Sequence, residues 1–209
     1  MTLTIHHLGV SASERILWLC EEIGLPYRLV KYDRDPQTRM APPAYRALHP
    51  FGTAPVIEED GLVLAESGAI VEYLLARHGG GRLIVGPADP AFAEYLFWFH
   101  FANGSMLPGM LNELTVRRLG STMDAGRDRA GRAFTLVEER LGCSAFFAGA
   151  ALTAADIMMV FPLTTMRAFA PRDLAPYPHI RAYLQRIGER PAYRAAMAKG
   201  DPDMAPLLV

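Results

Sequence analysis

The chain lacks several features that mark particular classes of protein. Its 209 residues include only two cysteines, Cys20 and Cys143, which form neither a CxxC pair nor a metal-ligand spacing. The six histidines show no HExxH or comparable pattern, so we expect no bound metal. Two isolated cysteines are most simply explained by a reducing, cytoplasmic compartment.

Long apolar runs and an excess of positive charge are also missing. No apolar run reaches the roughly 18–20 residues that a membrane helix needs, and Met1–Ile5 carries no charged leader typical of a signal peptide. The formal net charge is −1, so no basic surplus is available to neutralise phosphates, which argues against nucleic-acid binding. The neighbouring Arg127, Arg129 and Arg132 alternate with acids, as on an exposed helix face.

The first eighty residues alternate between strand and helix patterns. Apolar residues recur at helical spacing from Ile16 to Ile23, and Gly24 and Pro26 end that helix. Glu59-Asp60-Gly61 separates two short apolar runs and predicts a hairpin. The expected order is β-α-β followed by β-β-α. The expected strands are residues 3–8, 27–32, 56–58 and 62–64, and the other expected helices are residues 45–48 and 66–78.

Strand patterns disappear after Asp89. Long helical patterns follow at about 90–118, 124–141, 153–170 and 177–199. The Gly- and Pro-rich stretch Gly79–Pro90 is typical of a linker. The sequence therefore predicts an α/β domain over residues 1–80 and an all-α domain over residues 90–209.

Ser11-Ala12-Ser13-Glu14-Arg15 stands between the first strand and the first helix and allows two interpretations. In one, Ser11 caps the helix and Glu14 reaches back to form a capping box. In the other, a hydroxyl at the positive end of a helix stabilises a bound thiolate.

Two further motifs are similarly ambiguous. Pro55 at the start of a strand is either an ordinary trans proline or a cis proline that turns the Val56 N–H and C=O outward to pair with an extended peptide. Ser67 is either the N-cap of the next helix, with Glu66 facing its dipole, or part of a site for an amino-acid end. In that site Ser67 holds a carboxylate and Glu66 an ammonium.

These motifs in this order resemble the glutathione transferase family over almost the whole chain. The matching segments are Ser11–Tyr27, Leu48–Val56 and Leu64–Ile70. The resemblance implies a thioredoxin-like α/β N-terminal domain joined to an all-α helical C-terminal domain. It also implies that Pro55 is cis, that Val56 pairs with the cysteinyl backbone of glutathione, and that Glu66 and Ser67 hold the γ-glutamyl end.

The resemblance extends to the second domain and to a subclass. Leu152–Ile157 resembles a buried capping box of the family, so Thr153 and Asp156 are expected to direct folding. No tyrosine precedes Tyr27, and Val10 stands where cysteine-type relatives carry their thiol. Serine-type, microbial relatives therefore fit best.

Within the serine type, Ser11 aligns with the catalytic position, four residues before Arg15, and Ser13 is the alternative. Thr53 stands where many relatives carry a lysine, so Arg39 or His49 is expected to hold the glycine carboxylate of glutathione.

The activity that the resemblance implies is detoxification, by conjugation of glutathione to small hydrophobic electrophiles. Glutathione is then a co-substrate, no cofactor is tightly bound, and the protein is a homodimer. His100, Phe101 and Met106 are the candidates for the electrophile pocket, because such pockets are apolar. Two alternatives remain open: another glutathione-dependent activity, such as peroxidase or isomerase, and a non-catalytic binding or regulatory protein of the same fold.

Overall fold

The computed structural model describes residues 2–121 and 128–209. Arg127 and the first residues of the helix expected at 124–141 lie outside the described residues. The chain forms two compact units, of which the first contains Met1–Arg82 and Glu189–Pro206, and the second contains Leu83–Gly188 and Leu207–Val209. The sequence-based division differs from these units, because it assigns the whole of residues 90–209 to one helical domain.

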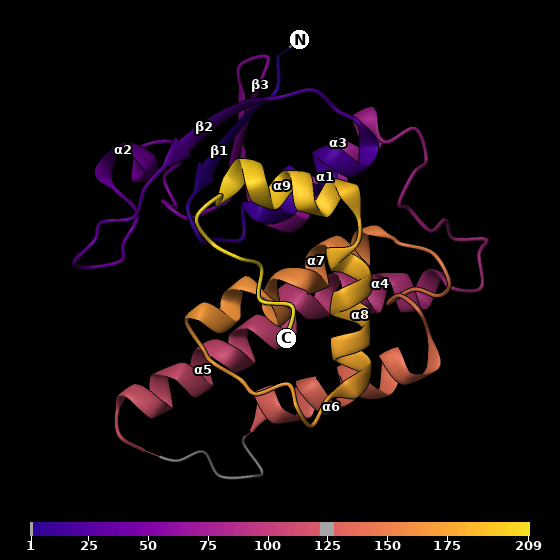
Figure 1. The fold of residues 1–209 in the computed structure, drawn as a ribbon. Coiled ribbons are helices and arrows are strands. Elements are labelled where there is room, and N and C mark those ends of the chain that lie inside the picture. Colours follow the sequence, from indigo (N-terminus) through magenta and orange to yellow (C-terminus); the bar gives the residue numbers. More distant parts are fainter. Residues whose placement is uncertain (1, 122–127) are drawn as a thin grey trace. The chain divides into compact units, whose positions relative to one another are not determined.

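A mixed sheet of four strands forms the first unit, in the order β2-β1-β3-β4 (Figure 1). β1 and β2 are parallel, as expected for strands separated by a helix, whereas β3 is antiparallel to both β1 and β4. Asp60 and Gly61 link β3 to β4 with φ of 48° and 84°, which fits the predicted hairpin. The strands are β1 (Thr4–Leu8), β2 (Arg28–Tyr32), β3 (Val56–Glu59) and β4 (Leu62–Ala65).

The helices of the first unit include one from the far end of the sequence. α9 lies beside α1 (Figure 1), and the rings of Trp18 and Tyr193 meet edge-on with centroids 5.3 Å apart. The helix predicted at 177–199 is therefore two helices, and Pro191 begins the second, because proline suits a first helical turn and not an interior one. The four helices are α1 (Glu14–Ile23), α2 (Pro43–Arg46), α3 (Ser67–His78) and α9 (Pro191–Gly200).

Neighbouring residues of β1 serve opposite faces of the sheet, since side chains alternate along a strand. Leu8 packs with Tyr45 of α2 on one face. His7 lies on the other face against Gly200 of α9, where an added Cβ would be only 3.1 Å from the imidazole. His7 is consequently fully buried.

The second unit is helical. α7 is buried along its whole length and packs on α4. The helix predicted at 90–118 contains α4, a π-helical segment and α5, and Pro108 lies in the first turn of α5. No helix among the described residues is both long and apolar enough to cross a membrane. The elements are α4 (Phe92–Phe101), η1 (Ala102–Met106), α5 (Leu107–Arg118), α6 (Arg129–Cys143), α7 (Ala154–Leu163), η3 (Thr165–Ala168) and α8 (Pro178–Gly188).

The capping box predicted at the start of α7 is confirmed. The carboxylate of fully buried Asp156 accepts hydrogen bonds from the Thr153 N–H at 2.8 Å and from the Thr153 hydroxyl at 3.1 Å. It also accepts from the Phe147 N–H at 3.1 Å and the Tyr183 hydroxyl at 3.0 Å. Burial raises the pKa of Asp156 to about 6, although these hydrogen bonds act to lower it.

Candidate active site

The loop between β1 and α1 is held in place from two sides. Val10 has a φ of 52°, which is rare for a β-branched residue and marks a constrained backbone. Its N–H donates to Asp201 Oδ1 at 3.0 Å. Arg34 donates from Nε to the Gly9 carbonyl at 2.8 Å and from Nη2 to the Val10 carbonyl at 3.1 Å. The residue that follows, Ser11, therefore has a fixed position.

Ser11 and Glu14 do not form the capping box that their spacing allowed. α1 begins at Glu14 with Ser13 as its N-cap residue, and no side chain caps it. Instead the Ser11 hydroxyl donates to the Leu8 carbonyl at 2.6 Å and lies 2.7 Å from the Ser13 hydroxyl. Ser13 is fully buried and also reaches Nδ1 of His7 at 2.9 Å, whereas Ser11 retains 4% exposure.

Backbone donors lie at the same place. The N–H groups of Ser11 and Ala12 make no hydrogen bond to any other described residue. They precede α1, where free N–H groups and the helix dipole favour an anion. This end of α1 can therefore accept a negatively charged atom.

The Ala54–Pro55 peptide bond is cis, as the resemblance implied. Val56 lies in an interior strand and pairs in register with His6 on one side and Ala65 on the other. The protein's own strands therefore flank it on both sides. Ala54 is half-buried and lies just outside the ladder, so it is better placed to pair with an added peptide. Sequence reasoning missed Ala54 because the end of the ladder was not known.

Glu66 and Ser67 stand at the start of α3, but their positions are shifted by one from the predicted cap. Glu66 is the N-cap residue, is exposed, and has a φ of 70°, whereas Ser67 is the first helical residue. The Ser67 hydroxyl accepts a hydrogen bond from Arg15 Nη1 at 3.0 Å. Burial lowers the pKa of Arg15 to about 9. Sequence reasoning used Arg15 only to align Ser11 and missed this link.

The two candidate cations lie in loops of the first unit. Arg39 is exposed with a φ of 60°, and its carbonyl accepts from Arg34 Nη1 at 2.9 Å. His49 is half-buried, and its Nδ1 accepts from the Phe51 N–H at 3.2 Å. This bond leaves Nε2 of His49 as the ring atom available to a ligand.

The three residues predicted to line an electrophile pocket have different surroundings in the second unit. His100 is exposed in the last turn of α4. Phe101 lines a groove of about 360 Å³ together with Ser105 and Arg129. Met106 is fully buried in η1, so its side chain does not line that groove.

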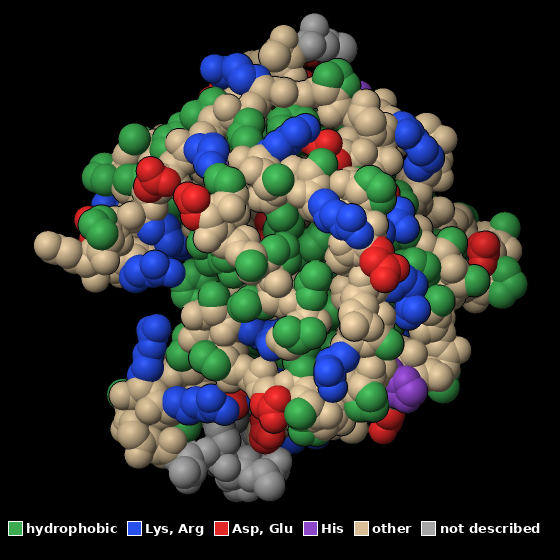
Figure 2. Space-filling model, viewed as in Figure 1, with side chains coloured by type: hydrophobic (Ala, Val, Ile, Leu, Met, Phe, Trp, Pro, Cys, Tyr) green, Lys and Arg blue, Asp and Glu red, His purple; other side chains and the backbone are tan. Residues whose placement is uncertain are grey.

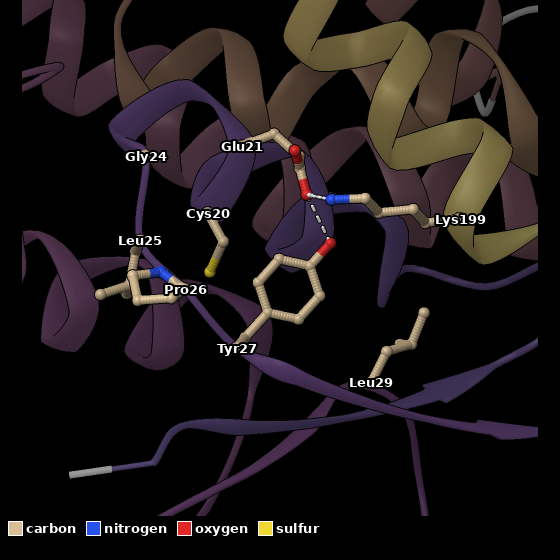
Figure 3. A pocket seen from close by; sticks show the side chains of 8 residues that line it. All are labelled: Cys20, Glu21, Gly24, Leu25, Pro26, Tyr27, Leu29 and Lys199. Carbon is tan, nitrogen blue, oxygen red and sulfur yellow. Dashed lines mark hydrogen bonds and ion pairs between the residues drawn. The ribbon is translucent and has the colours of Figure 1, made fainter.

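The first unit contains a cavity of about 570 Å³, larger than the groove beside Phe101 (Figure 3). None of the predicted site residues lines it. Its polar groups bond to one another, because the Tyr27 hydroxyl and Lys199 Nζ each lie 2.6 Å from Glu21 Oε1. Cys20 also lines it, and burial raises the pKa of its thiol, which keeps it protonated. The cavity offers no reactive group.

Neither the charges on one face nor the metal-ligating side chains of the described residues point to another site. On the face shown in Figure 2, acidic and basic side chains are interspersed. Within residues 2–121 and 128–209, no three His, Cys, Asp or Glu side chains are grouped so as to hold a metal ion.

Known proteins resemble both units. The chain matches the family model described as Glutathione S-transferase, N-terminal domain over residues 11–77, and the C-terminal domain model over residues 121–186. It is 31% identical to Glutathione S-transferase 3 of Schizosaccharomyces pombe, over 94% of this chain and 87% of that protein. It is 29% identical to GstB of Escherichia coli K12, over 87% and 90%. A glutathione S-transferase structure from Actinobacillus pleuropneumoniae matches with a TM-score of 0.87 and 33% identity, covering 99% of both chains.

Proposed function

Because the chain belongs to the glutathione S-transferase family, we propose that it conjugates the thiolate of glutathione to small hydrophobic electrophiles. The observation that supports this proposal is the fixed hydroxyl of Ser11 at the start of α1. It stands in a loop that Arg34 and Asp201 hold, beside backbone N–H groups that have no acceptor among the described residues. Glutathione is a co-substrate in this reaction, and no tightly bound cofactor is proposed.

Glutathione binding is assigned to the first unit. Glu66 holds the ammonium of the γ-glutamyl end and Ser67 its carboxylate, with Ser67 fixed by Arg15. We assign pairing with the cysteinyl main chain to Ala54, since the main chain of Val56 is engaged in the sheet. Arg39 or His49 holds the glycine carboxylate, since both lie in loops of the first unit.

Ser11 promotes the reaction by favouring ionisation of the thiol. A cysteine-like thiol has a pKa of about 8.5, so only a few per cent is thiolate at neutral pH. A hydrogen bond to a charged acceptor contributes roughly 1.5–3 kcal/mol, which lowers the pKa of the bound thiol by about 1–2 units. The thiol proton leaves to solvent. The sulfur then forms a bond to the electrophilic carbon as the carbon–halogen bond of an aryl halide, or the ring C–O bond of an epoxide, breaks.

The deciding experiment is the thiolate absorbance of bound glutathione against pH, for wild type, Ser11→Ala and Ser13→Ala. We expect Ser11→Ala to raise the pKa of the bound thiol and to lower the rate near pH 7 by about ten- to a hundredfold. The rate deficit should shrink above about pH 9, where the thiolate forms unaided. If only Ser13→Ala moves the titration, Ser13 is the activating residue. If neither does, the backbone N–H groups of Ser11 and Ala12 activate the thiol.

Substrate class and assembly are proposed on the family alone. Turnover of aryl halides, epoxides and isothiocyanates, but not of hydroperoxides, would favour conjugation over peroxidase activity. A homodimer is proposed, and a monomeric mass in solution at micromolar concentration would contradict it. A cytoplasmic location is proposed because Cys20 and Cys143 are both free thiols.

A further inference from the structure

A continuous chain of side chains links Ser11 to the end of α9. Its hydroxyl lies 2.7 Å from that of Ser13, which lies 2.9 Å from Nδ1 of His7. Nε2 of His7 lies 3.2 Å from Oδ2 of Asp201, the residue that ends α9. His7 and Ser13 are fully buried, so water does not compete for the bond between them. This series of hydrogen bonds joins His7 to Asp201, which lie 194 positions apart in the sequence.

One arrangement of hydrogens gives each contact of this chain of side chains a donor. The Leu8 carbonyl can only accept, and the Ser11 hydroxyl lies 2.6 Å from it, closer than the Ser13 hydroxyl at 3.3 Å, so in this arrangement Ser11 donates to it. Each serine has one hydroxyl hydrogen, so Ser13 then donates to Ser11, and Nδ1–H of His7 donates to Ser13. The carboxylate of Asp201 also only accepts, so Nε2 of His7 donates to it.

Charge supports this arrangement. Burial acts to raise the pKa of Asp201, but its hydrogen bond to His7, the charge of that ring, the Val10 N–H and Lys31 together hold the pKa below its ordinary value. Asp201 is therefore ionised and accepts the hydrogen bond from Nε2 of His7. The hydrogen bonds that start at the His7 ring polarise one another in the same direction.

The direction of these hydrogen bonds determines whether Ser11 can donate to a ligand. Its oxygen accepts from the Ser13 hydroxyl and from the Ser13 N–H at 3.2 Å. Ser11 therefore offers its own hydrogen, which donates to the Leu8 carbonyl and is free to turn toward another acceptor.

We propose that His7 and Asp201 are positioning residues that act through Ser13 to keep the Ser11 hydroxyl a hydrogen-bond donor to the glutathione sulfur. This inference rests on the proposed function, in which Ser11 stabilises the thiolate. When glutathione binds, the hydroxyl hydrogen of Ser11 turns from the Leu8 carbonyl to the sulfur. No proton changes atoms along the chain, and no bond is made or broken within it.

Two substitutions of His7 test its two hydrogen bonds one at a time. In His7→Asn the amide nitrogen replaces Nδ1 and still donates to Ser13, whereas in His7→Gln it replaces Nε2 and reaches only Asp201. We expect His7→Gln to raise the pKa of bound glutathione thiol and to lower kcat near pH 7 by about two- to tenfold. The affinity of His7→Gln for glutathione should stay within about twofold of wild type, and the His7→Asn variant should retain most of the wild-type rate.

His6→Gln is the matched control, because His6 is nearly as buried and lies on the opposite face of β1, bonded to the Tyr32 hydroxyl at 3.0 Å. It should leave the thiol titration unchanged. The double variant Ser13→Ala/His7→Gln should match Ser13→Ala alone, because both break the same chain. The inference is overturned if His7→Gln shifts the thiol titration no more than His6→Gln does. It is also overturned if the shifts caused by Ser13→Ala and His7→Gln add in full in the double variant.

Ser11→Ala separates failure of this inference from failure of the proposed function. If Ser11→Ala moves the thiol titration and His7→Gln does not, the inference fails and the role of Ser11 stands. If Ser11→Ala leaves the thiol titration unchanged, both this inference and the proposed role of Ser11 fail. Nitrogen NMR of the His7 ring gives a readout without substrate: hydrogens on both nitrogens are expected, and an unprotonated Nδ1 contradicts the inference.

Discussion

Arg15 donates a hydrogen bond to the hydroxyl of Ser67 across 52 positions of sequence, at a distance of 3.0 Å. The bond links the first turn of α1 to the first residue of α3. The two helix starts that we assign to the sulfur and to the γ-glutamyl end of glutathione are thereby coupled. A buried arginine that fixes one hydroxyl is a structural support for the binding site.

Removal of either γ-glutamyl contact should weaken glutathione binding. Glu66→Ala and Ser67→Ala each remove a charge-assisted contact, and we expect an affinity loss of about ten- to a hundredfold. Calorimetry measures the change, and Glu72→Ala, an exposed acid on the same helix, is the control. Unchanged affinity in both variants would exclude this assignment.

Arg15→Lys tests the support beneath Ser67. Lysine keeps the positive charge but cannot reproduce the planar guanidinium geometry, so glutathione affinity should fall by about threefold or more. In a Ser67→Ala background the same substitution should cost little further affinity, since the bond is already absent. Full additivity in a double-mutant cycle would show that Arg15 acts elsewhere.

The cation for the glycine carboxylate can be identified by two single substitutions. One of Arg39→Ala and His49→Ala should weaken glutathione about tenfold, whereas the other should change little. In the variant that binds glutathione more weakly, Thr53→Lys should recover affinity, because Thr53 is exposed in the same unit and a lysine there supplies a new positive charge. No effect from either substitution would move this contact to another residue.

Asp156→Ala should destabilise the protein strongly, because it leaves buried donors of Thr153, Phe147 and Tyr183 without an acceptor. We expect a loss of at least about 3 kcal/mol in the free energy of unfolding, measured with denaturant. Asp173→Ala is the control, since Asp173 is exposed and accepts only the Ala175 N–H in the hydrogen bonds described. A loss equal to that of the control would contradict a folding role.

Asp156 should also leave a signature in the pH dependence of stability. Burial raises its pKa from 3.8 to about 6, so the folded protein holds this proton to a higher pH than the unfolded chain. Its contribution to the free energy of unfolding therefore falls as pH rises from about 4 to about 6, by roughly 3 kcal/mol, and is constant above. The free energy of unfolding is measured against pH for wild type and for Asp156→Asn, in which residue 156 does not titrate. The difference between the two curves isolates the effect of Asp156, and parallel curves would refute it.

Local patterns predicted most of the fold, but contacts distant in sequence could not be predicted. The parallel pair β1–β2, the hairpin at Asp60-Gly61 and the capping box at Thr153 each depend on residues close in sequence or on a short connection. The chain His7–Ser13–Ser11 could not be found this way, because its far partner, Asp201, carries no signal that relates it to β1.

The shifted caps show a second limit. One of the two interpretations of each motif made Ser11 and Ser67 the N-caps, yet Ser13 and Glu66 occupy those positions. A serine near a helix start has several backbone and side-chain partners of similar energy, so the choice among them depends on the tertiary structure. The role of Val56 depends on the tertiary structure in the same way, because the strands on both sides of it decide where its main chain points.

The return of α9 to the first unit matters while the protein is being made. Synthesis proceeds from the N-terminus, so β1 and α1 leave the ribosome well before Glu189–Pro206, which completes their packing. A nascent chain that stops earlier has neither Tyr193 to cover Trp18 nor Asp201 to hold Val10 and His7. The loop between β1 and α1 is thus completed last, and an interrupted translation product lacks the contacts that hold this loop in place.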